Sequence, residues 1–503
     1  MSYLMGIDLG TSSLKVIIID IKGNIQVESS KGYQFDSPIN GYAEQKTDIW
    51  WSACCECIRD ALSRLNVPAS EIGALSFSGQ MHGVVLLDKN RNVIRPAILH
   101  CDARSGEQVQ KINRLFKEKH LSDSQLNPVY TGFLLTSLVW VRDNEPELYG
   151  RVRYAFLPKD FLKMMLCGEI GSDYSDASAT LAYDIQQNCW SKEVLDALDI
   201  PLDFFPECSA SDHIAGRVTK KAAEATGLRE GTVVVNGGAD QVMQAVGNGA
   251  IRPGQATVNI GSSGQVCFQS DKPIRNPDLS TNTFCAYRSG AWITMGATMS
   301  AGLAFKWFRS IFPGGDYRTL DGEIEKLVPG SGGLLFLPYL NGERTPHVNP
   351  NISGMFMGLN LNTTGTHMAR AVMEGVTYSL LQCIEICGIL GLKAGELIAS
   401  GGGARSPVWL QMQADVYNMP LKTTVTEEQA CIGAAVMAGV GSGAFGSVEE
   451  ACASFVRYKD KVYTPNAKNH DIYRQYYCLY KDVYTGSQKT IQSLTELGRL
   501  QAG

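Results

Sequence analysis

The sequence predicts an α/β protein made of two related domains that face one cleft. Three observations support this fold class: short β-branched runs alternate with helical segments, a hairpin with a small-residue turn begins the chain, and a similar hairpin lies near its middle. At 503 residues the chain is too long for one core and fits two large domains.

The first hairpin is predicted over residues 5–20, with Gly10, Thr11 and Ser12 in its tight turn. Backbone amides approach polyphosphate oxygens only where no large side chain intervenes, and this turn carries small side chains. Asp8, just before the turn, is suited to hold a hydrated Mg²⁺ that bridges those phosphates. An ordinary surface hairpin is the alternative if the turn stands alone.

The second hairpin is predicted over residues 256–268, and its turn begins with Gly261 and Ser262. When the two turns are superposed, Asp8 falls opposite Asn259, so only the first half keeps the carboxylate. This correspondence indicates a duplicated architecture in which two domains face one nucleotide. Chance similarity between two short hairpins is the alternative.

The remaining elements follow from periodicity and from turn signals. In the first half we predict strands over residues 73–78, 84–87, 154–157 and 232–235, and helices over 48–65, 105–117, 159–166 and 219–226. In the second half we predict strands near 256 and 292 and over 397–400, and helices over 363–390, 407–417 and 430–440. Gly and Pro cluster over 247–254, which predicts a hinge between domains 1–247 and 248–503.

Two glycine-rich turns connect a predicted strand to a predicted helix. In the first, Asp240 follows a buried strand at the point where α/β sheets open onto a cleft. A helix N-cap is an equally good explanation for Asp240, and a general base for a hydroxyl group is the functional one. In the second, Gly402 and Gly403 would let an adenine ring or a phosphate lie against the backbone, and Ser406 with Pro407 starts a helix. A plain flexible loop is the alternative there.

A third polar segment, residues 341–347, follows an apolar run. Glu343 and Arg344 within it are suited to pair with each other or with the neighbouring domain. We expect a structural role for them.

Composition excludes several classes of protein. With 44% hydrophobic and 19% charged residues and a net charge of −5, the chain is typical of soluble globular proteins, and no basic run with interleaved aromatics indicates nucleic acid binding. We find no apolar stretch of membrane-spanning length and no signal peptide, and we expect a cytoplasmic protein. The 14 cysteines are expected to be reduced thiols, and Cys54 and Cys57 lack the partners of a zinc site.

The chain contains no P-loop and no protein-kinase signature. It resembles the FGGY family of carbohydrate kinases, of the RNase H-like actin, hexokinase and chaperone ATPase superfamily, from residue 3 to about residue 443. The motifs that carry the resemblance lie at residues 6–12, 237–240, 258–263, 342–347 and 400–404. Residues 78–83, Ser-Gly-Gln-Met-His-Gly, look like the signature of family members that phosphorylate D-xylulose.

The resemblance implies ATP-dependent phosphorylation of a small-molecule sugar in a cleft between the domains, most specifically of D-xylulose to D-xylulose 5-phosphate. It implies that Asp240 accepts the proton and that Asp8 organises Mg²⁺. The implied phosphate contacts are Thr11, Ser12, Lys15, Gly261 and Ser262, and the implied adenosine contacts are Gly402 and Gly403. The implied sugar contacts are Gln80, Met81, His82, Asp102 and Gln241.

The chain departs from the family near the sugar. The family usually has Trp within the segment 99–104, and Asn where this chain has Gln241. Ribulose, gluconate and glycerol are therefore alternative substrates, and a nucleotide-regulated binding module is the alternative from another class. The Tyr-rich segment after Pro465 is expected to be a helix that packs on the second domain, with a homodimer contact as the alternative.

Overall fold

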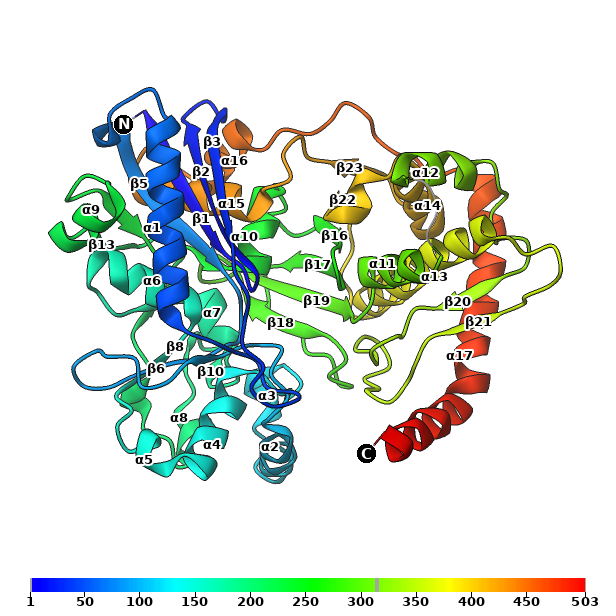
Figure 1. The fold of residues 1–503 in the computed structure, drawn as a ribbon, viewed down its shortest axis with the longest axis horizontal. Helices are drawn as coiled ribbons and strands as arrows, with labels where there is room; N and C mark the ends of the chain where they lie inside the picture. The colour runs from blue at the N-terminus through cyan, green and yellow to red at the C-terminus, as the bar shows by residue number, and fades with distance from the viewer. Residues whose placement is uncertain (1, 313–315, 503) are drawn as a thin grey trace.

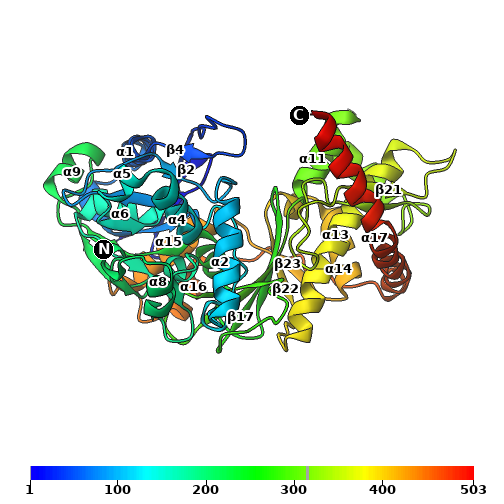
Figure 2. The same cartoon turned by 90° about the horizontal axis from the view of Figure 1, so that it is seen from below.

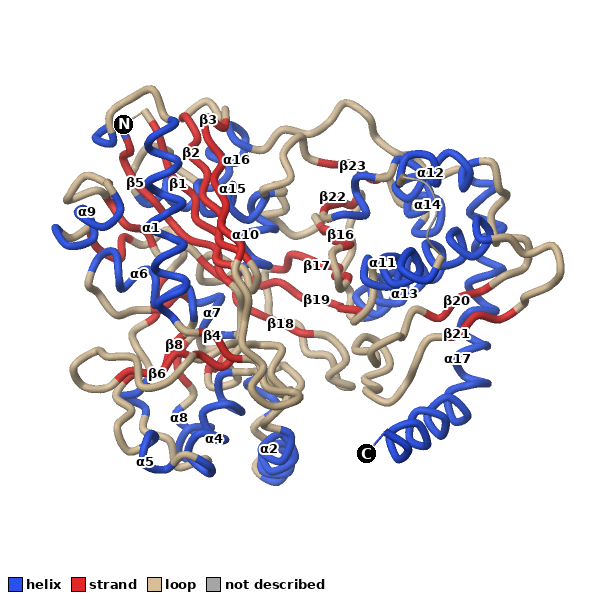
Figure 3. The backbone as a smooth tube through the Cα atoms, viewed as in Figure 1, coloured by secondary structure: helices blue, strands red, loops and turns tan. Residues whose placement is uncertain are grey.

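The computed structural model describes residues 2–312 and 316–502, which form two lobes (Figure 1). Each lobe is built on a mixed β-sheet with helices packed against it, and Figure 3 shows the strands of the first lobe enclosed between helices. The predicted α/β fold class is confirmed.

The first sheet has the strand order β13-β14-β5-β1-β2-β3. β1 (Tyr3–Leu9) pairs antiparallel with β2 (Ser13–Asp20) and parallel with β5 (Ile72–Gly79), so the predicted first hairpin forms. The other strands are β3 (Ile25–Gly32), β13 (Ile214–Arg217) and β14 (Val233–Val235), and β15 (Gly238–Ala239) pairs with the end of β5. The helices α1 (Thr47–Arg64), α6 (Pro158–Cys167) and α9 (Lys220–Thr226) share an apolar core with this sheet.

A long insertion between β5 and β13 forms the lower part of the first lobe in Figure 1. It holds β6 (Val85–Leu87), β8 (Tyr154–Phe156), β9 (Ser172–Asp173), α2 (Gly106–Glu118), α4 (Leu134–Asn144), α7 (Tyr174–Ser178) and α8 (Lys192–Ala197). Many of its apolar residues form a separate core cluster, and the predicted strands and helix of this region are confirmed within one or two residues.

The second sheet repeats the arrangement of the first, in the order β18-β19-β17-β16-β22-β23. β16 (Ala256–Ile260) pairs antiparallel with β17 (Gly264–Ser270) and parallel with β22 (Leu397–Ser400). Its other strands are β18 (Asn282–Cys285), β19 (Trp292–Thr298) and β23 (Leu421–Thr423). Against it pack α13 (Gly365–Ile389) and α14 (Pro407–Tyr417). α11 (Gly302–Ile311) packs on α13, α12 (Tyr317–Glu325) packs on α13 and α14, and the small pair β20 (Leu335–Leu337) and β21 (Met355–Met357) completes the lobe.

Two helices from late in the sequence pack against the first sheet. α15 (Gln429–Gly441) lies on β1 and β5, and α16 (Val448–Phe455) lies on α15 (Figure 1). The contact is close because Gly6 has no side chain: a Cβ there would lie 2.0 Å from the Cys431 carbonyl oxygen. Residues 247–256, 423–429 and 456–463 therefore all pass between the lobes. The division at residue 247 stays a proposal, since a single cut does not separate the two packing units.

Helix α17 (Ala467–Ala502) runs along the outer side of the second lobe (Figure 2). The buried rings of Tyr473, Tyr477, Tyr480 and Tyr484 join the core of that lobe, as expected for the Tyr-rich segment. Among the described residues, α13 alone has the length and composition of a membrane span, and 67% of its apolar window is buried inside the lobe. It is a core helix here, although the sequence analysis found no such stretch.

Candidate active site

Two carboxylates lie at neighbouring strand ends of the first sheet. Asp8 is opposite Ser78 in the parallel register of β1 with β5, and Ser78 is opposite Gly238 in β15. Asp240, two residues beyond Gly238, is the first residue of α10 (Asp240–Gly247). The fold thus brings together the two residues that the sequence singled out for catalysis, although they lie far apart in the chain.

Burial is the main influence on the pKa values of both carboxylates. Burial of its carboxylate raises the pKa of Asp240 to about 7, the negative charge of Asp8 adds to the rise, and hydrogen bonds with Gln241 oppose it. Burial also raises the pKa of Asp8, while Ser78 and the positive charge of Lys15 lower it in part. A carboxyl group with a pKa near neutrality exchanges protons readily at physiological pH, which suits a general base.

Asp240 does not act as a helix N-cap. The N-cap position of α10 belongs to Ala239, and no side chain caps this helix. The alternative that the sequence left open is therefore not realised. Two buried side-chain amide atoms near Asp240 have no hydrogen-bond partner among the described residues: the oxygen of Gln241 and the nitrogen of Gln80. Such unpaired buried groups are costly unless a ligand completes them.

The first phosphate turn is braced through its carbonyl groups. Tyr33 donates its hydroxyl to the Gly10 oxygen at 2.7 Å, and Gln45 donates to the Thr11 oxygen at 3.3 Å. Within the described chain, the N–H groups of Thr11 and Ser12 have no acceptor in the protein. The Thr11 hydroxyl also bonds the Gln80 amide oxygen at 3.2 Å, which connects this turn to the segment 78–83. The arrangement leaves backbone donors free for an anion.

The second turn has the same design. The Gly261 and Ser262 carbonyl oxygens accept bonds from the start of α11, at 2.8 Å from Gly302 and 3.0 Å from Ala301. In the part of the chain that is described, the N–H groups of Gly261 and Ser262 have no protein acceptor. Glu343 supports the neighbouring strand end, because its buried carboxylate accepts bonds from Thr298 and from the Met299 N–H.

The glycine run after β22 packs against the end of β16. A Cβ at Gly403 would lie 2.6 Å from the Ile260 Cβ, whereas a Cβ at Gly402 would meet nothing closer than 3.7 Å. Gly402 is exposed, and Gly403 is buried. The α14 start is as predicted, with Ser406 accepting a bond from the Trp409 N–H at 3.1 Å and Pro407 in the first turn.

Lys15 lies on β2 opposite Asp8, and its ammonium group forms an ion pair with Glu428 at 2.7 Å. Glu428 immediately precedes α15, so the pair links the first hairpin to a segment 413 residues later. In this conformation Lys15 is engaged by protein, and its contact with a γ-phosphate stays a prediction.

The imidazole of His82 is held in one orientation. Its Nδ1 lies 2.8 Å from the Ala179 carbonyl oxygen and its ring stacks on Phe133 with centroids 3.9 Å apart. A carbonyl oxygen only accepts, so Nδ1 carries the hydrogen and Nε2 is an acceptor. Burial lowers the pKa of His82 to about 3, and the ring is neutral. A fixed neutral acceptor is suited to bind a hydroxyl group.

Three residues near His82 were missed by the sequence analysis or given another role. Arg344 reaches from the second lobe and lies 5.3 Å from the Tyr130 ring centroid. Burial lowers the pKa of His100 to about 4, and the charge of Arg344 contributes to the shifts of both His100 and His82. A buried Nδ1 of His100 has no partner within the described residues. His100 lies within residues 99–104, where the family usually has Trp. That departure from the family was the only sequence signal that pointed to this position.

Two predicted sugar contacts, Asp102 and Met81, are packed within the protein in this structure. Asp102 is fully buried and saturated: it accepts bonds from the Ala43 N–H at 2.6 Å and from Arg104 at 2.8–3.0 Å. In this structure the Asp102 carboxylate joins two loops, and its contact with sugar stays a prediction. Met81 is 5% exposed and belongs to the apolar core shared by the two lobes, and its contact with sugar stays a prediction.

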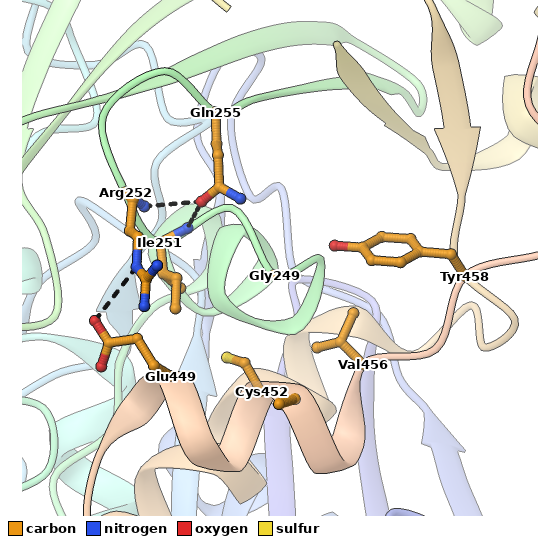
Figure 4. Close-up of a pocket in the computed structure, with 9 residues that line it drawn as sticks. Gly249, Ile251, Arg252, Gln255, Glu449, Cys452, Val456 and Tyr458 are labelled. Atoms are coloured by element: carbon orange, nitrogen blue, oxygen red, sulfur yellow. Dashed lines mark hydrogen bonds and ion pairs between the residues drawn. The ribbon is translucent and has the colours of Figure 1, made fainter. Parts of the chain in front are cut away.

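A hollow of about 230 Å³ lies at the lobe connections (Figure 4). Arg252 and Gln255 line it from the first connecting segment, Glu449 and Cys452 from α16, and Tyr458 from the third segment. Arg252 and Glu449 form a 3.7 Å ion pair across it. No predicted site residue lines this hollow, so it is separate from the two phosphate turns.

These features define a two-lobed α/β protein with a turn of free backbone N–H groups on each lobe and a carboxylate pair on the first, an arrangement suited to phosphoryl transfer. Residues 3–247 match the N-terminal domain and residues 256–442 the C-terminal domain of the FGGY family of carbohydrate kinases. The chain belongs to this family.

Individual relatives are similar over nearly their whole length. The chain is 38% identical to the xylulose kinase of Lactococcus lactis over 99% of both chains, and 37% identical to that of Bacillus subtilis over 96% of this chain and 97% of the relative. The crystal structure of xylulose kinase from Rhodospirillum rubrum superposes with a TM-score of 0.89 at 25% identity, covering 97% of this chain and 99% of that chain. The chain is an enzyme of the carbohydrate kinase class.

Proposed function

We propose that the protein transfers the γ-phosphoryl group of ATP to the terminal hydroxyl of D-xylulose, giving D-xylulose 5-phosphate and ADP. The observation that supports this reaction is the Asp240 carboxylate, which starts α10 beside Asp8 and has a pKa of about 7. The relatives named xylulose kinase favour D-xylulose over ribulose, gluconate and glycerol.

In the proposed reaction the sugar hydroxyl lies against Asp240. As the hydroxyl oxygen bonds to the γ-phosphorus, its proton passes to the Asp240 carboxylate and the bond from phosphorus to the β–γ bridging oxygen breaks. Phosphoryl transfer has a loose transition state, so the protein contributes mainly position and charge. The N–H groups of the two turns would hold the phosphate oxygens from both lobes.

Mg²⁺ fits the residues of the first lobe. Among the described residues there is no group of three or more His, Cys, Asp or Glu that encloses a metal, but Mg²⁺ commonly binds one or two carboxylates together with substrate phosphates and water. Burial raises the pKa of the Asp8 carboxylate, and the opposing effects of Ser78 and Lys15 offset that rise only in part. Bound there, Mg²⁺ would neutralise charge on the phosphates.

His82, Gln80 and Gln241 would bind the sugar hydroxyls, with Arg344 closing over them from the second lobe. His82 offers a fixed acceptor, and the unpaired amide atoms of Gln80 and Gln241 offer a donor and an acceptor. The cytoplasm, which supplies ATP, is the compartment we propose for this reaction. All 14 cysteines are free thiols, as such a reducing compartment requires.

The test is a coupled ADP-release assay with D-xylulose, D-ribulose, D-gluconate and glycerol. We expect kcat/KM for D-xylulose to exceed the others by at least about tenfold, a difference that a site built on hydroxyl recognition readily provides. Equal or higher kcat/KM for another sugar would overturn the substrate assignment. ATP turnover that does not depend on any sugar would overturn the reaction.

A further inference from the structure

Five charged side chains are buried behind the proposed general base, and the reaction described above uses none of them. Lys159, Lys163, Asp160, Asp173 and Asp176 all have side chains that are at most 1% exposed. The ammonium group of Lys159 lies 2.6 Å from Asp160, 3.2 Å from Asp173 and 3.4 Å from Asp176. Burying five charged side chains has a high desolvation free energy, and hydrophobic side chains of similar volume often stabilise a fold equally well or better.

The cluster lies against the strand end that carries the site. A Cβ at Gly79 would lie 2.5 Å from the Lys159 Cβ, so α6 packs directly on the last residue of β5. Gly79 pairs with Ala239 in the register of β5 with β15. The cluster and Asp240 are therefore separated by one strand pair.

A chain of hydrogen bonds leads from the cluster to the residue before Asp240. The Ser175 hydroxyl donates to Asp173, which pairs with Lys159, and the same hydroxyl accepts the Ala239 N–H at 2.9 Å. Ala239 is the N-cap of α10, and no side chain caps that helix. The side-chain oxygen of Ser175 thus holds the backbone N–H of the residue that precedes Asp240.

We infer that the chain Lys159–Asp173–Ser175–Ala239 is a positioning device that holds the Asp240 carboxylate at its reacting position. Ser175 is a positioning residue, since it acts through Ala239 and touches no substrate. The inference rests on the proposed role of Asp240 as the general base.

The charge balance of the cluster agrees with this assignment. Burial raises the pKa of Asp176 well above its usual value; Lys159 opposes the rise, and the carboxylates of Asp173, Asp160 and Asp240 add to it. The raised pKa of Asp176 favours its protonated form, which lowers the excess of negative charge around the two ammonium groups. The Lys159 ammonium group, 3.2 Å from Asp173, faces the carboxylate that accepts the Ser175 hydroxyl, and a hydrogen bond assisted by a nearby charge is stronger.

Ser175→Ala removes one oxygen and leaves the α7 cap intact, because Asp173 still accepts the backbone N–H of residue 175 at 2.9 Å. Ser172→Ala is the matched control: Ser172 donates to Asp160 of the same cluster at 2.6 Å and has no bond to Ala239. Both variants damage the cluster, and only one breaks the chain to Asp240. Ser175→Cys, which keeps a side chain of similar size with a weak acceptor, provides a second version of the test.

We expect Ser175→Ala to lower kcat by about 10-fold to 10²-fold, the scale of a small misplacement of a reacting group, with KM for sugar and ATP within about twofold. Ser172→Ala should keep kcat within about twofold at a similar loss of Tm. Equal kcat in the two variants, per folded enzyme, would overturn the inference. Asp240→Asn, assayed beside them, distinguishes failure of the inference from failure of the proposed function. Normal turnover by Asp240→Asn would show that Asp240 is not the general base. An inactive Asp240→Asn together with a normal Ser175→Ala would refute only the positioning role of Ser175.

Discussion

The two sheets present the same framework with different chemistry at their strand ends. In the first, Asp8 lies opposite Ser78, and Gly79 follows; in the second, Asn259 lies opposite Ser400, and Gly401 follows. Both hairpin turns leave backbone N–H groups free. The framework therefore offers free backbone donors twice, once in each lobe.

The lobes diverge immediately beyond these positions. The first continues with Gln80, Met81 and His82, whereas the second continues with Gly402 and Gly403. Side chains that bind a sugar are needed on one side of the cleft, and bare backbone that admits a nucleotide is needed on the other. The amide of Asn259 donates to Gln244 of α10 and to Gln265, both at 3.2 Å, so the second lobe uses this position to hold the helix that begins with Asp240.

The largest effect is expected at Asp240, which has no counterpart in the second lobe. Asp240→Asn should keep the fold and lower kcat by about 10²-fold to 10⁴-fold, because the variant has no base for the sugar proton. Stopped-flow or coupled assays measure kcat, and calorimetry checks that sugar still binds. Asp316→Asn, at the start of α12, changes another helix-start aspartate and should leave kcat unchanged. Near-normal turnover by Asp240→Asn would end the assignment.

His82 tests whether the first lobe alone binds the sugar. His82→Ala should lower kcat/KM for the preferred sugar by about 10²-fold while ATP affinity stays unchanged, since a fixed hydrogen-bond acceptor is lost. His347, another half-buried neutral histidine that stacks on Tyr484, provides the control. His347→Ala should lower Tm with little change in kcat/KM. If the two variants behave alike, His82 is a structural histidine.

The glycine run tests whether the second lobe acts through backbone. Gly402→Ala should fold normally and raise KM for ATP by about tenfold, because the added methyl group faces the nucleotide and meets no protein atom within 3.4 Å. Gly403→Ala should instead lower Tm, since its methyl group would overlap Ile260. An unchanged KM for ATP in the Gly402 variant would place the nucleotide elsewhere.

A smaller effect is expected on stability. The pKa of Asp240 is raised in the folded state, so the ionised form destabilises the fold, and that cost grows as pH rises from about 4 through about 7. Asp240→Asn should therefore be more stable than the wild type at pH 8, on the order of 1 kcal/mol after solvent screening, and equally stable near pH 4. Chemical denaturation at the two pH values measures the difference; a variant less stable at pH 8 would contradict the raised pKa.

Local patterns predicted the elements well. Residues 397–400 and 407–417 form a strand and a helix with the predicted bounds, because Ser406 and Pro407 fix the helix start and glycines end the strand. The hairpins, Asp8 and Asp240 were found because small-residue turns leave a strong local signal. Each of these features depends on neighbours in sequence.

Long-range packing was not predictable in this way. Nothing within α15 indicates that it packs on β1, more than 400 residues earlier, and the close approach depends on Gly6 meeting Cys431. Arg344 was expected to pair with Glu343 or with the neighbouring domain, and it does reach the other lobe, but its partner there, Tyr130, had no sequence signal. The sequence did not show that the Asp102 carboxylate already has partners in the protein. Its pairing with Arg104 and with the Ala43 N–H becomes visible only when two loops are placed together.

The comparison between the lobes is tested most directly by exchanging its one charge difference. Asp8→Asn makes the first hairpin like the second, and Asn259→Asp makes the second like the first. Measured by Mg²⁺ titration of kcat at saturating sugar, Asp8→Asn should lower kcat by about 10²-fold or more and raise the Mg²⁺ requirement. Asn259→Asp should leave the Mg²⁺ requirement unchanged. A normal Mg²⁺ titration for Asp8→Asn, or a shifted one for Asn259→Asp alone, would contradict the claim that the first lobe carries the metal and the chemistry.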